Sequence, residues 1–273
     1  MLPAPDPSFE WVETAWGPAL VCRPLAAVAP HLFTTRAWTL GSPAGGEDEG
    51  WSEVAAALQI DGADLVRVRQ VHVAAAVVRH AGEAPPQGVP ADIVATDAPH
   101  AAAAVRAADC VPILVADPRS GAVAAAHAGW RGTALGVAAR TVDVLAGEYD
   151  SRPEDLVAAI GPSIGPCCYE VGDLRSCFTG AVDRWFLAEP LRLPRNPPLR
   201  GLEGSARPGR WFLDLWTATR DQLRQAGVRV DRIFAAELCT ASHAVFCSYR
   251  RDGAGAGRLA AAIRTRAAER GAR

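Results

Sequence analysis

The sequence predicts an α+β protein in which a mixed β-sheet sandwich is flanked by helices. Three observations favour this class. Short apolar runs typical of strands interleave irregularly with helical patterns. No internal repeat or long low-complexity linker divides the 273 residues. The apolar segments on either side of each polar loop are too short to form separate cores. We therefore expect a single domain over residues 1–273, with residues 1–10 as a flexible N-terminal segment.

The first half of the chain predicts one helix and a series of strands. Residues 41–50 are polar and predict an exposed loop, and residues 51–58 have helical spacing. Runs typical of strands cover residues 65–71, 74–78, 93–96 and 101–106. Two further apolar runs, 112–116 and 122–126, flank the sequence Asp-Pro-Arg-Ser-Gly, which is favourable for a turn. These two runs predict a β-hairpin.

The second half predicts two helices and two strands around one long loop. Helical periods cover residues 133–145 and 214–226, and the second period ends at Gly227, where a left-handed cap is expected. Residues 156–160 and 228–234 predict strands. Residues 191–210 are rich in Pro, Gly and Arg and predict a surface loop.

Composition excludes several classes of partner. Lys and Arg number 28 against 30 Asp and Glu, a net charge of −2, so no basic excess favours nucleic acid. There is no polybasic run for an anionic membrane and no uninterrupted apolar run long enough to span a bilayer. The seven Cys include no C-x-x-C pair, which suits a reducing compartment. Without a signal-peptide pattern at the N-terminus, we expect a cytoplasmic protein.

The hairpin carries the densest group of reactive residues. Cys110 precedes its first strand and His127 follows its second, so antiparallel pairing should bring them together at one edge, with Asp109 beside them. A lone Cys is more often a packing residue, but the pair indicates a site. It could be a nucleophilic Cys–His dyad or part of a metal site, and the pattern leaves both open.

His72, in the sequence Arg-Gln-Val-His, would complete a His₂Cys set with Cys110 and His127. Three protein ligands and an open fourth position are the arrangement of catalytic zinc, and copper is the alternative ion. We expect Cys110, His127 and Asp109 to be catalytic, with Asp109 orienting a ligand or carrying a proton. Arg131, next to the expected start of a helix, is a candidate phosphate-binding residue, and so are Arg36, Arg250 and Arg251. We interpret the adjacent Cys167 and Cys168 as packing residues.

Six motifs in series resemble the YfiH/LACC1-like family, long labelled polyphenol oxidase or laccase-domain proteins. They are R-Q-V-H (69–72), A-D-C-V-P-I-L (108–114), H-A-G-W-R-G (127–132), G-P-S-I-G-P-C-C-Y-E-V (161–171), L-C-T (238–240) and F-C-S-Y-R-R-D (246–252). The resemblance runs from about residue 33 to the C-terminus. It departs from the family pattern at residues 37–50, where the usual glycine-rich stretch and Asn-Leu-Gly are missing.

The resemblance implies a fold, a metal and an activity. It implies an α/β sandwich-like domain with zinc bound by His72, Cys110 and His127. It also implies phosphorolysis of adenosine, inosine and 5′-methylthioadenosine to the free base and ribose 1-phosphate, with adenosine deaminase activity. The expected partners are a purine nucleoside and phosphate, and the expected assembly is a monomer or a small homo-oligomer.

Three rival functions follow from the same residues. A copper-dependent polyphenol oxidase would need many His ligands to reduce dioxygen, and the chain has six His. A metal-free Cys–His hydrolase would use Cys110 as its nucleophile. A non-enzymatic interaction domain with a closed zinc site would need a fourth protein ligand, for which Cys239 or Cys247 are the candidates.

Overall fold

Two six-stranded mixed sheets pack face to face in the computed structural model, which describes residues 2–42, 46–86, 88–180 and 182–266. The first sheet has the order β1 (Phe9–Thr14), β2 (Gly17–Cys22), β3 (His31–Phe33), β15 (Leu259–Arg264), β7 (Ala102–Ala107), β4 (Leu65–Val66). The second has the order β14 (Ile233–Ala235), β10 (Val157–Ile160), β8 (Val111–Ala116), β9 (Val123–Ala128), β6 (Ile93–Thr96), β5 (Ala76–Arg79). A small third sheet joins β11 (Glu170–Gly172), β13 (Arg210–Leu213) and β12 (Phe186–Leu187).

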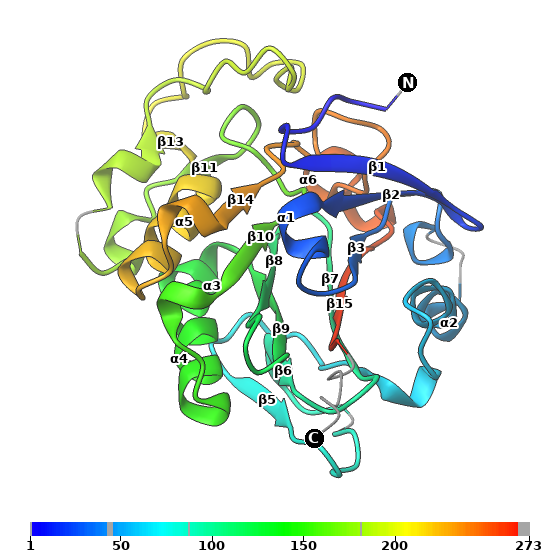
Figure 1. Ribbon diagram of the computed structural model, residues 1–273. Coiled ribbons are helices and arrows are strands. Elements are labelled where there is room, and N and C mark those ends of the chain that lie inside the picture. The colour runs from blue at the N-terminus through cyan, green and yellow to red at the C-terminus, as the bar shows by residue number, and fades with distance from the viewer. Residues whose placement is uncertain (1, 43–45, 87, 181, 267–273) are drawn as a thin grey trace.

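Helices cover the outer faces of the sandwich. Helix α2 (Glu47–Ala57) packs Trp51 and Val54 against the first sheet, while α4 (Val137–Tyr149) and α5 (Leu215–Gln225) cover the second (Figure 1). Shorter helices are α1 (Arg23–Ala26), α3 (Trp130–Ala134) and α6 (Tyr249–Asp252). Single 3-10 turns cover Thr39–Gly41, Gly62–Asp64, Pro153–Asp155, Arg175–Cys177, Asp183–Trp185, Val230–Arg232 and Gly253–Gly255. The predicted class, an α+β sandwich flanked by helices, is confirmed.

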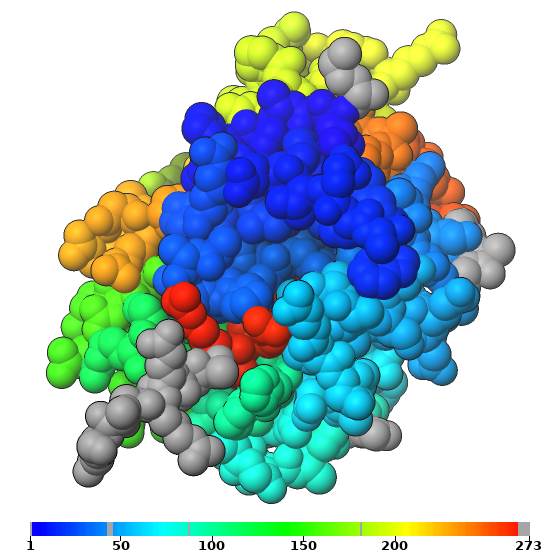
Figure 2. Space-filling view, turned by 45° about the vertical axis from the view of Figure 1, so that its right-hand side comes forward, coloured from blue at the N-terminus to red at the C-terminus, as the bar shows by residue number. Residues whose placement is uncertain are grey.

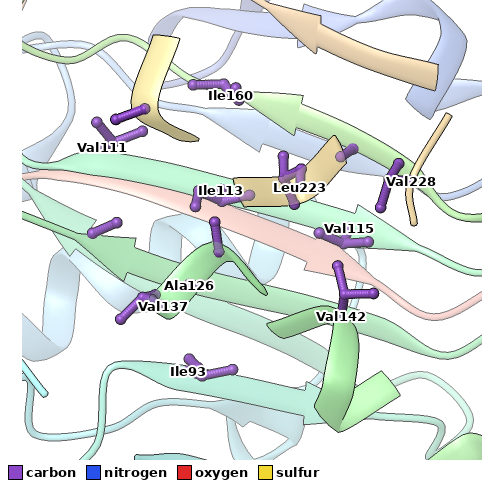
Figure 3. Close-up of a cluster of buried hydrophobic side chains, with 14 of the residues drawn as sticks. Ile93, Val111, Ile113, Val115, Ala126, Val137, Val142, Ile160, Leu223 and Val228 are labelled. Atoms are coloured by element: carbon purple, nitrogen blue, oxygen red, sulfur yellow. The ribbon is translucent and has the colours of Figure 1, made fainter. Parts of the chain in front are cut away.

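Strand β8 shows why the sandwich forms. All six of its residues are buried, and its alternate side chains belong to different layers. Ile113 and Val115 pack with the helices on one face, and Leu114 packs against the first sheet on the other. Figure 3 shows the helix side of this arrangement, where Val142 of α4 and Leu223 of α5 lie over the strands. A strand apolar on both faces is stable only between two covering layers.

Several predicted elements differ in extent. The helix expected over 133–145 is two helices, because Gly136 adopts a φ of +76° between α3 and α4. Helix α2 begins at Glu47, inside the predicted exposed loop 41–50. Within that stretch Gly50 is buried and lies so close to Leu40 that an added Cβ would be 2.5 Å from Leu40 Cγ. Residues 43–45 lie outside the described residues. The strand predicted over 65–71 ends at Val66, and the next residues form a loop that carries the site.

Within residues 1–10, which we expected to be flexible, Pro3 and Asp6 make hydrogen bonds to other parts of the chain, and Met1 lies outside the described residues. The Trp11 indole donates to Pro3 O at 2.8 Å, the Asp6 N–H donates to Ala236 O at 3.3 Å, and β1 already begins at Phe9. Figure 2 shows this segment and the first strands as one surface, with the C-terminal strand emerging beneath it.

Strand β15, from the end of the chain, lies between β3 and β7. Because distant parts of the chain share one sheet, we propose that residues 1–273 form a single domain. No helix in the described part of the chain is long and apolar enough to cross a membrane.

Candidate metal centre

The predicted hairpin brings Cys110 and His127 together. Strands β8 and β9 pair in antiparallel register with Pro112 opposite His127, and Cys110 directly precedes β8. His127 lies within β9 rather than after it, one residue before the strand ends. The turn expected at Asp-Pro-Arg-Ser-Gly closes the far end, so the reactive residues lie at the open edge.

His72 reaches the same edge from the loop between β4 and β5. Its φ of +63° is unusual for a residue other than glycine. The loop is held on both sides of His72: the N–H groups of Val71 and Val73 donate to Asp92 Oδ2 at 3.1 and 2.8 Å. Before it, the Gln70 side chain accepts the Arg106 N–H at 2.8 Å and donates to Arg106 O at 2.7 Å. These hydrogen bonds hold the backbone of His72 in its strained conformation.

The three side chains form a donor set of the right size for zinc. Their ligand atoms lie within 4.8 Å of one another, and Cys110 Sγ is 3.8 Å from His72 Nε2. Tetrahedral zinc, with Zn–S near 2.3 Å and Zn–N near 2.0–2.1 Å, would separate such atoms by about 3.6 Å. The residues therefore fit a zinc ion with only small adjustment.

Gly129 leaves the space that this set occupies. A Cβ at position 129 would lie 2.7 Å from Cys110 Sγ and 3.2 Å from His72 Cδ2. The first distance is shorter than real Cβ contacts and the second is tighter than most, so any larger residue would displace the Cys110 sulfur. The first glycine of His-Ala-Gly-Trp-Arg-Gly is thus required by the site itself.

Asp92 orients the third ligand. Its Oδ1 lies 2.7 Å from His127 Nδ1, which leaves His127 Nε2 to face Cys110 and His72. Burial would raise the pKa of Asp92, but bonds from His127 and the Val73 and Val71 N–H groups outweigh it, and the pKa is lowered. A carboxylate that holds a ligating imidazole is a common feature of zinc sites. Asp92 was not among the residues that the sequence pattern singled out, and the signal that could have found it is a carboxylate placed directly before the fully buried strand β6.

Cys110 and His127 favour their charged forms together. Burial opposes ionisation of Cys110, but hydrogen bonds from His127 and His72 prevail and lower the pKa of the thiol to about 6. Burial likewise disfavours protonated His127, yet Asp92 and the Cys110 sulfur raise its pKa to about 9. Without a metal the pair is a thiolate and an imidazolium at neutral pH, and a thiolate is the form that binds metal.

Asp109 lies beside the donor set but does not orient it, which corrects one of its two predicted roles. Its φ is +89°, and its oxygens accept the Thr240 hydroxyl and the Arg250 N–H, both at 2.6 Å. Burial raises the pKa of Asp109 in spite of these bonds. The orienting role belongs to Asp92, and only the role of proton carrier stays a proposal for Asp109.

The donor set opens into a cavity of about 560 Å³, within the range of small-molecule sites. Besides the donor set, Asp109 and Gly129, its polar and aromatic walls are Gln70, Arg106, Trp130, Arg131, Tyr169, Tyr249, Arg250 and Arg258. Four arginines give the cavity positive charge that suits an anion, although Arg106 is already paired with Glu47. The three aromatic rings offer flat apolar faces, and Tyr249 is 58% exposed.

The four candidate arginines have different positions. Arg131 and Arg250 line the cavity. Arg36 is not among the lining residues and pairs with Asp252. The Arg251 guanidinium donates to the backbone oxygens of Thr240, Ala241, His243 and Phe246 and to Asp252. Arg36 and Arg251 are thus not among the residues that line the cavity, and their role as phosphate ligands stays a prediction.

A closed site with a fourth Cys is not formed by either sequence candidate. Cys239 groups with Cys167 and Cys168, and the Cys247 thiol donates to Gly41 O at 3.5 Å. Among the described residues, the His₂Cys set therefore offers three protein ligands and is open toward the cavity. Catalytic zinc sites have this arrangement of ligands.

Residues 48–266 match the profile of the family described as multi-copper polyphenol oxidoreductase laccase. A Deinococcus radiodurans protein named purine nucleoside phosphorylase is 36% identical over 92% of this chain and 94% of its own length. The Geobacillus stearothermophilus purine nucleoside phosphorylase YlmD is 43% identical over 57% of this chain, and the match spans 53% of that relative. The chain therefore spans about half the length of this relative and nearly all of the Deinococcus protein.

Solved structures agree with this assignment. The Bacillus licheniformis hypothetical protein YfiH superposes with a TM-score of 0.77 at 29% identity, covering 91% of this chain and 96% of that one. The YlmD structure from Geobacillus stearothermophilus gives a TM-score of 0.72 at 31% identity, covering 94% and 98%. The resemblance seen in the sequence is confirmed: this chain belongs to the laccase-like family, described as multi-copper polyphenol oxidoreductase, that includes YfiH and YlmD.

Proposed function

We propose that the chain is a zinc-dependent purine nucleoside phosphorylase. The observation that carries the proposal is the open His72, Cys110 and His127 set at the base of a cavity rich in arginine and aromatic rings. The names of the relatives, purine nucleoside phosphorylase, support an enzyme of this kind. A phosphorylase must hold one anion and one flat base side by side, and this cavity offers groups for both.

The lining residues divide between these two tasks. Arg131 and Arg250 present guanidinium groups to phosphate, and the Arg250 side chain is fixed by donating to Cys168 O and Glu170 O at 3.2 and 3.0 Å. Tyr169, Tyr249 and Trp130 offer faces for the purine. A phosphate oxygen forms a bond to C1′ as the C1′–N9 bond breaks, and the purine leaves with the electron pair and takes up a proton. Asp109, whose pKa is raised by burial, is the candidate source of that proton.

A bound zinc would act as a Lewis acid toward an oxygen of water or substrate. Cys110 would bind the ion as a thiolate, and His127 would release its Nε2 proton to solvent and bind as the neutral imidazole, with Asp92 holding the proton on Nδ1. We extend the proposal to adenosine, inosine and 5′-methylthioadenosine as substrates. It also includes deamination of adenosine, in which water replaces the C6 amino group and ammonia leaves.

Copper-dependent phenol oxidation is the rival that the family description favours. Reduction of dioxygen to water takes four electrons, and multicopper sites distribute these over several His-rich centres. Among the described residues, only the His72, Cys110 and His127 set combines His with another ligand type, and the second possible metal cluster holds thiols alone. We therefore place nucleoside chemistry first.

The test is product analysis of the metal-loaded protein with adenosine, with and without phosphate. We expect adenine and ribose 1-phosphate only when phosphate is present, and inosine in either condition. His72→Asn should abolish each product. His100→Asn is a matched control, because His100 is also exposed and also has a positive φ, of 64°. Absence of every product from fully loaded wild type, with phenol oxidation in its place, would overturn the proposal.

A further inference from the structure

A second group of metal-binding side chains lies outside the cavity. Cys167, Cys168 and Cys239 are fully buried, and their sulfur atoms lie within 4.8 Å of one another. Their surroundings are apolar and include Ile164, Trp216 and Ala241. A packing role, which the sequence favoured for the first two, does not require three sulfurs from two distant segments to meet at one point.

The backbone fixes this meeting point. Ser163 and Cys239 form a parallel bridge, which brings the segment after β10 against the segment after β14. The Gly165 N–H donates to Cys239 Sγ at 3.2 Å, and a Cβ at position 165 would lie 2.6 Å from the Trp216 ring. The Leu199 N–H donates to Cys168 Sγ at 3.3 Å. Two of the three sulfurs therefore already accept backbone hydrogen bonds, as metal-bound thiolates commonly do.

The three thiols of the cluster differ in acidity. Burial opposes ionisation of Cys239, but hydrogen bonds from the Cys167 and Cys168 thiols and from Gly165 N–H lower its pKa. The bond to Cys168 raises the pKa of Cys167. The bond from Cys167 lowers the pKa of Cys168, but contact with the Cys239 sulfur and burial raise it to about 11.

Two guanidinium groups lie close enough to offset further negative charge. Arg250 Nη1 donates to Cys168 O at 3.2 Å, and Arg251 Nη1 donates to Thr240 O at 2.8 Å, next to Cys239. A buried anion is tolerated when positive groups and hydrogen-bond donors are arranged around it. This arrangement lowers the free-energy cost of converting the thiols of Cys167, Cys168 and Cys239 to thiolates.

We propose that Cys167, Cys168 and Cys239 form a second, closed metal site that binds one Cu(I) ion through three sulfur atoms. Thiolates select soft ions such as Cu(I) and zinc. Zinc takes four ligands in closed protein sites, and the nearest further oxygen atom is the neutral Ser242 hydroxyl, 3.5 Å from Cys168 Sγ and 3.6 Å from Cys167 Sγ. Three sulfurs around a metal at about 2.3 Å would lie about 4.0 Å apart, within the limit that the structure shows.

Binding at this site is redox-neutral. Copper enters and remains as Cu(I), three Cu–S bonds form, and each thiol that ligates the ion releases its proton to solvent. The entry side is the segment over residues 191–209, whose Pro197 O and Leu199 N–H contact Cys168 Sγ. A cavity of about 230 Å³ opens on this segment and reaches Asn196, whose side chain accepts the Cys239 N–H at 2.9 Å.

The site does not depend on the proposed phosphorylase activity, and its test uses binding alone. In the His72→Asn/Cys110→Ser background, which removes two ligands of the first centre, Cu(I) is titrated without oxygen against a chromophoric Cu(I) chelator. We expect one equivalent bound and an X-ray absorption spectrum with three sulfur neighbours and no nitrogen. Adding Cys239→Ser should remove this equivalent, whereas Cys177→Ser, at the exposed cysteine, should leave it unchanged.

Four results would each overturn the proposal. One is equal Cu(I) binding with and without Cys239→Ser, when circular dichroism shows that both proteins are folded. Others need no substitution in the cluster: the His72→Asn/Cys110→Ser protein coordinates Cu(I) through nitrogen, or it binds no copper at all. Stoichiometric zinc at the cluster that Cu(I) does not displace would likewise refute the choice of ion.

Discussion

Asp92 makes the sharpest test of the first metal centre, because one carboxylate holds two ligand-bearing segments. Its Oδ1 contacts His127 Nδ1 at 2.7 Å, and its Oδ2 accepts the N–H groups on either side of His72. In Asp92→Asn the amide oxygen can still accept the two backbone N–H groups. The amide nitrogen then faces His127 Nδ1 and donates to it, so the imidazole proton moves to Nε2, the atom that should bind the metal.

The expected loss follows from this tautomer change. Removal of a carboxylate that orients a ligating His costs about 10–100-fold in metal affinity, which is about 1.4–2.8 kcal/mol. Zinc affinity is measured by competition with a chromophoric chelator at pH 7.5. Asp231→Asn is the matched control, because Asp231 is exposed and pairs with Arg229 on the surface, where such a pair contributes little. A zinc affinity for Asp92→Asn within twofold of the control would refute the reasoning.

Three further predictions test other parts of the structure. Gly129→Ala should abolish zinc binding, because its Cβ would lie 2.7 Å from Cys110 Sγ. The control is Gly147→Ala, which lies in helix α4 with open space around it and should raise the free energy of unfolding by about 0.5–1 kcal/mol. In metal-free Cys177→Ser protein, the rate of Cys110 alkylation by iodoacetamide should rise with pH through about 6, because the pKa of the Cys110 thiol is lowered to that value in the folded state. Zinc should protect the thiol. A midpoint of the rate profile above pH 8 would contradict the prediction. Arg251→Ala should lower the free energy of unfolding by about 2–4 kcal/mol, because the charged hydrogen bonds of Arg251 to backbone oxygens are lost. Urea denaturation measures this change. If the KM for phosphate changes while the stability does not, Arg251 belongs to the substrate site instead.

Local sequence pattern was sufficient for much of the fold. The runs around Ile113 and Ala124 predicted the hairpin because an alternating or fully apolar run has few other stable forms, and its turn residues favour one closure. That hairpin alone placed Cys110 near His127. The boundaries were less secure where a single residue decided them, as at Gly136, whose left-handed conformation splits one predicted helix into two.

The sequence by itself determined the fold class, the hairpin and the residues that could serve as metal ligands, since these depend on neighbours along the chain. Only the tertiary structure decided how the ligands are held. Asp92 and His127 are 35 positions apart and meet because β6 pairs with β9. Arg250 and Arg251 are adjacent and both donate to backbone carbonyls, yet only Arg250 is among the residues that line the cavity. Cys239 joins Cys167 and Cys168 across more than 70 positions. Such contacts depend on where strands lie in three dimensions, which local residue preferences do not encode.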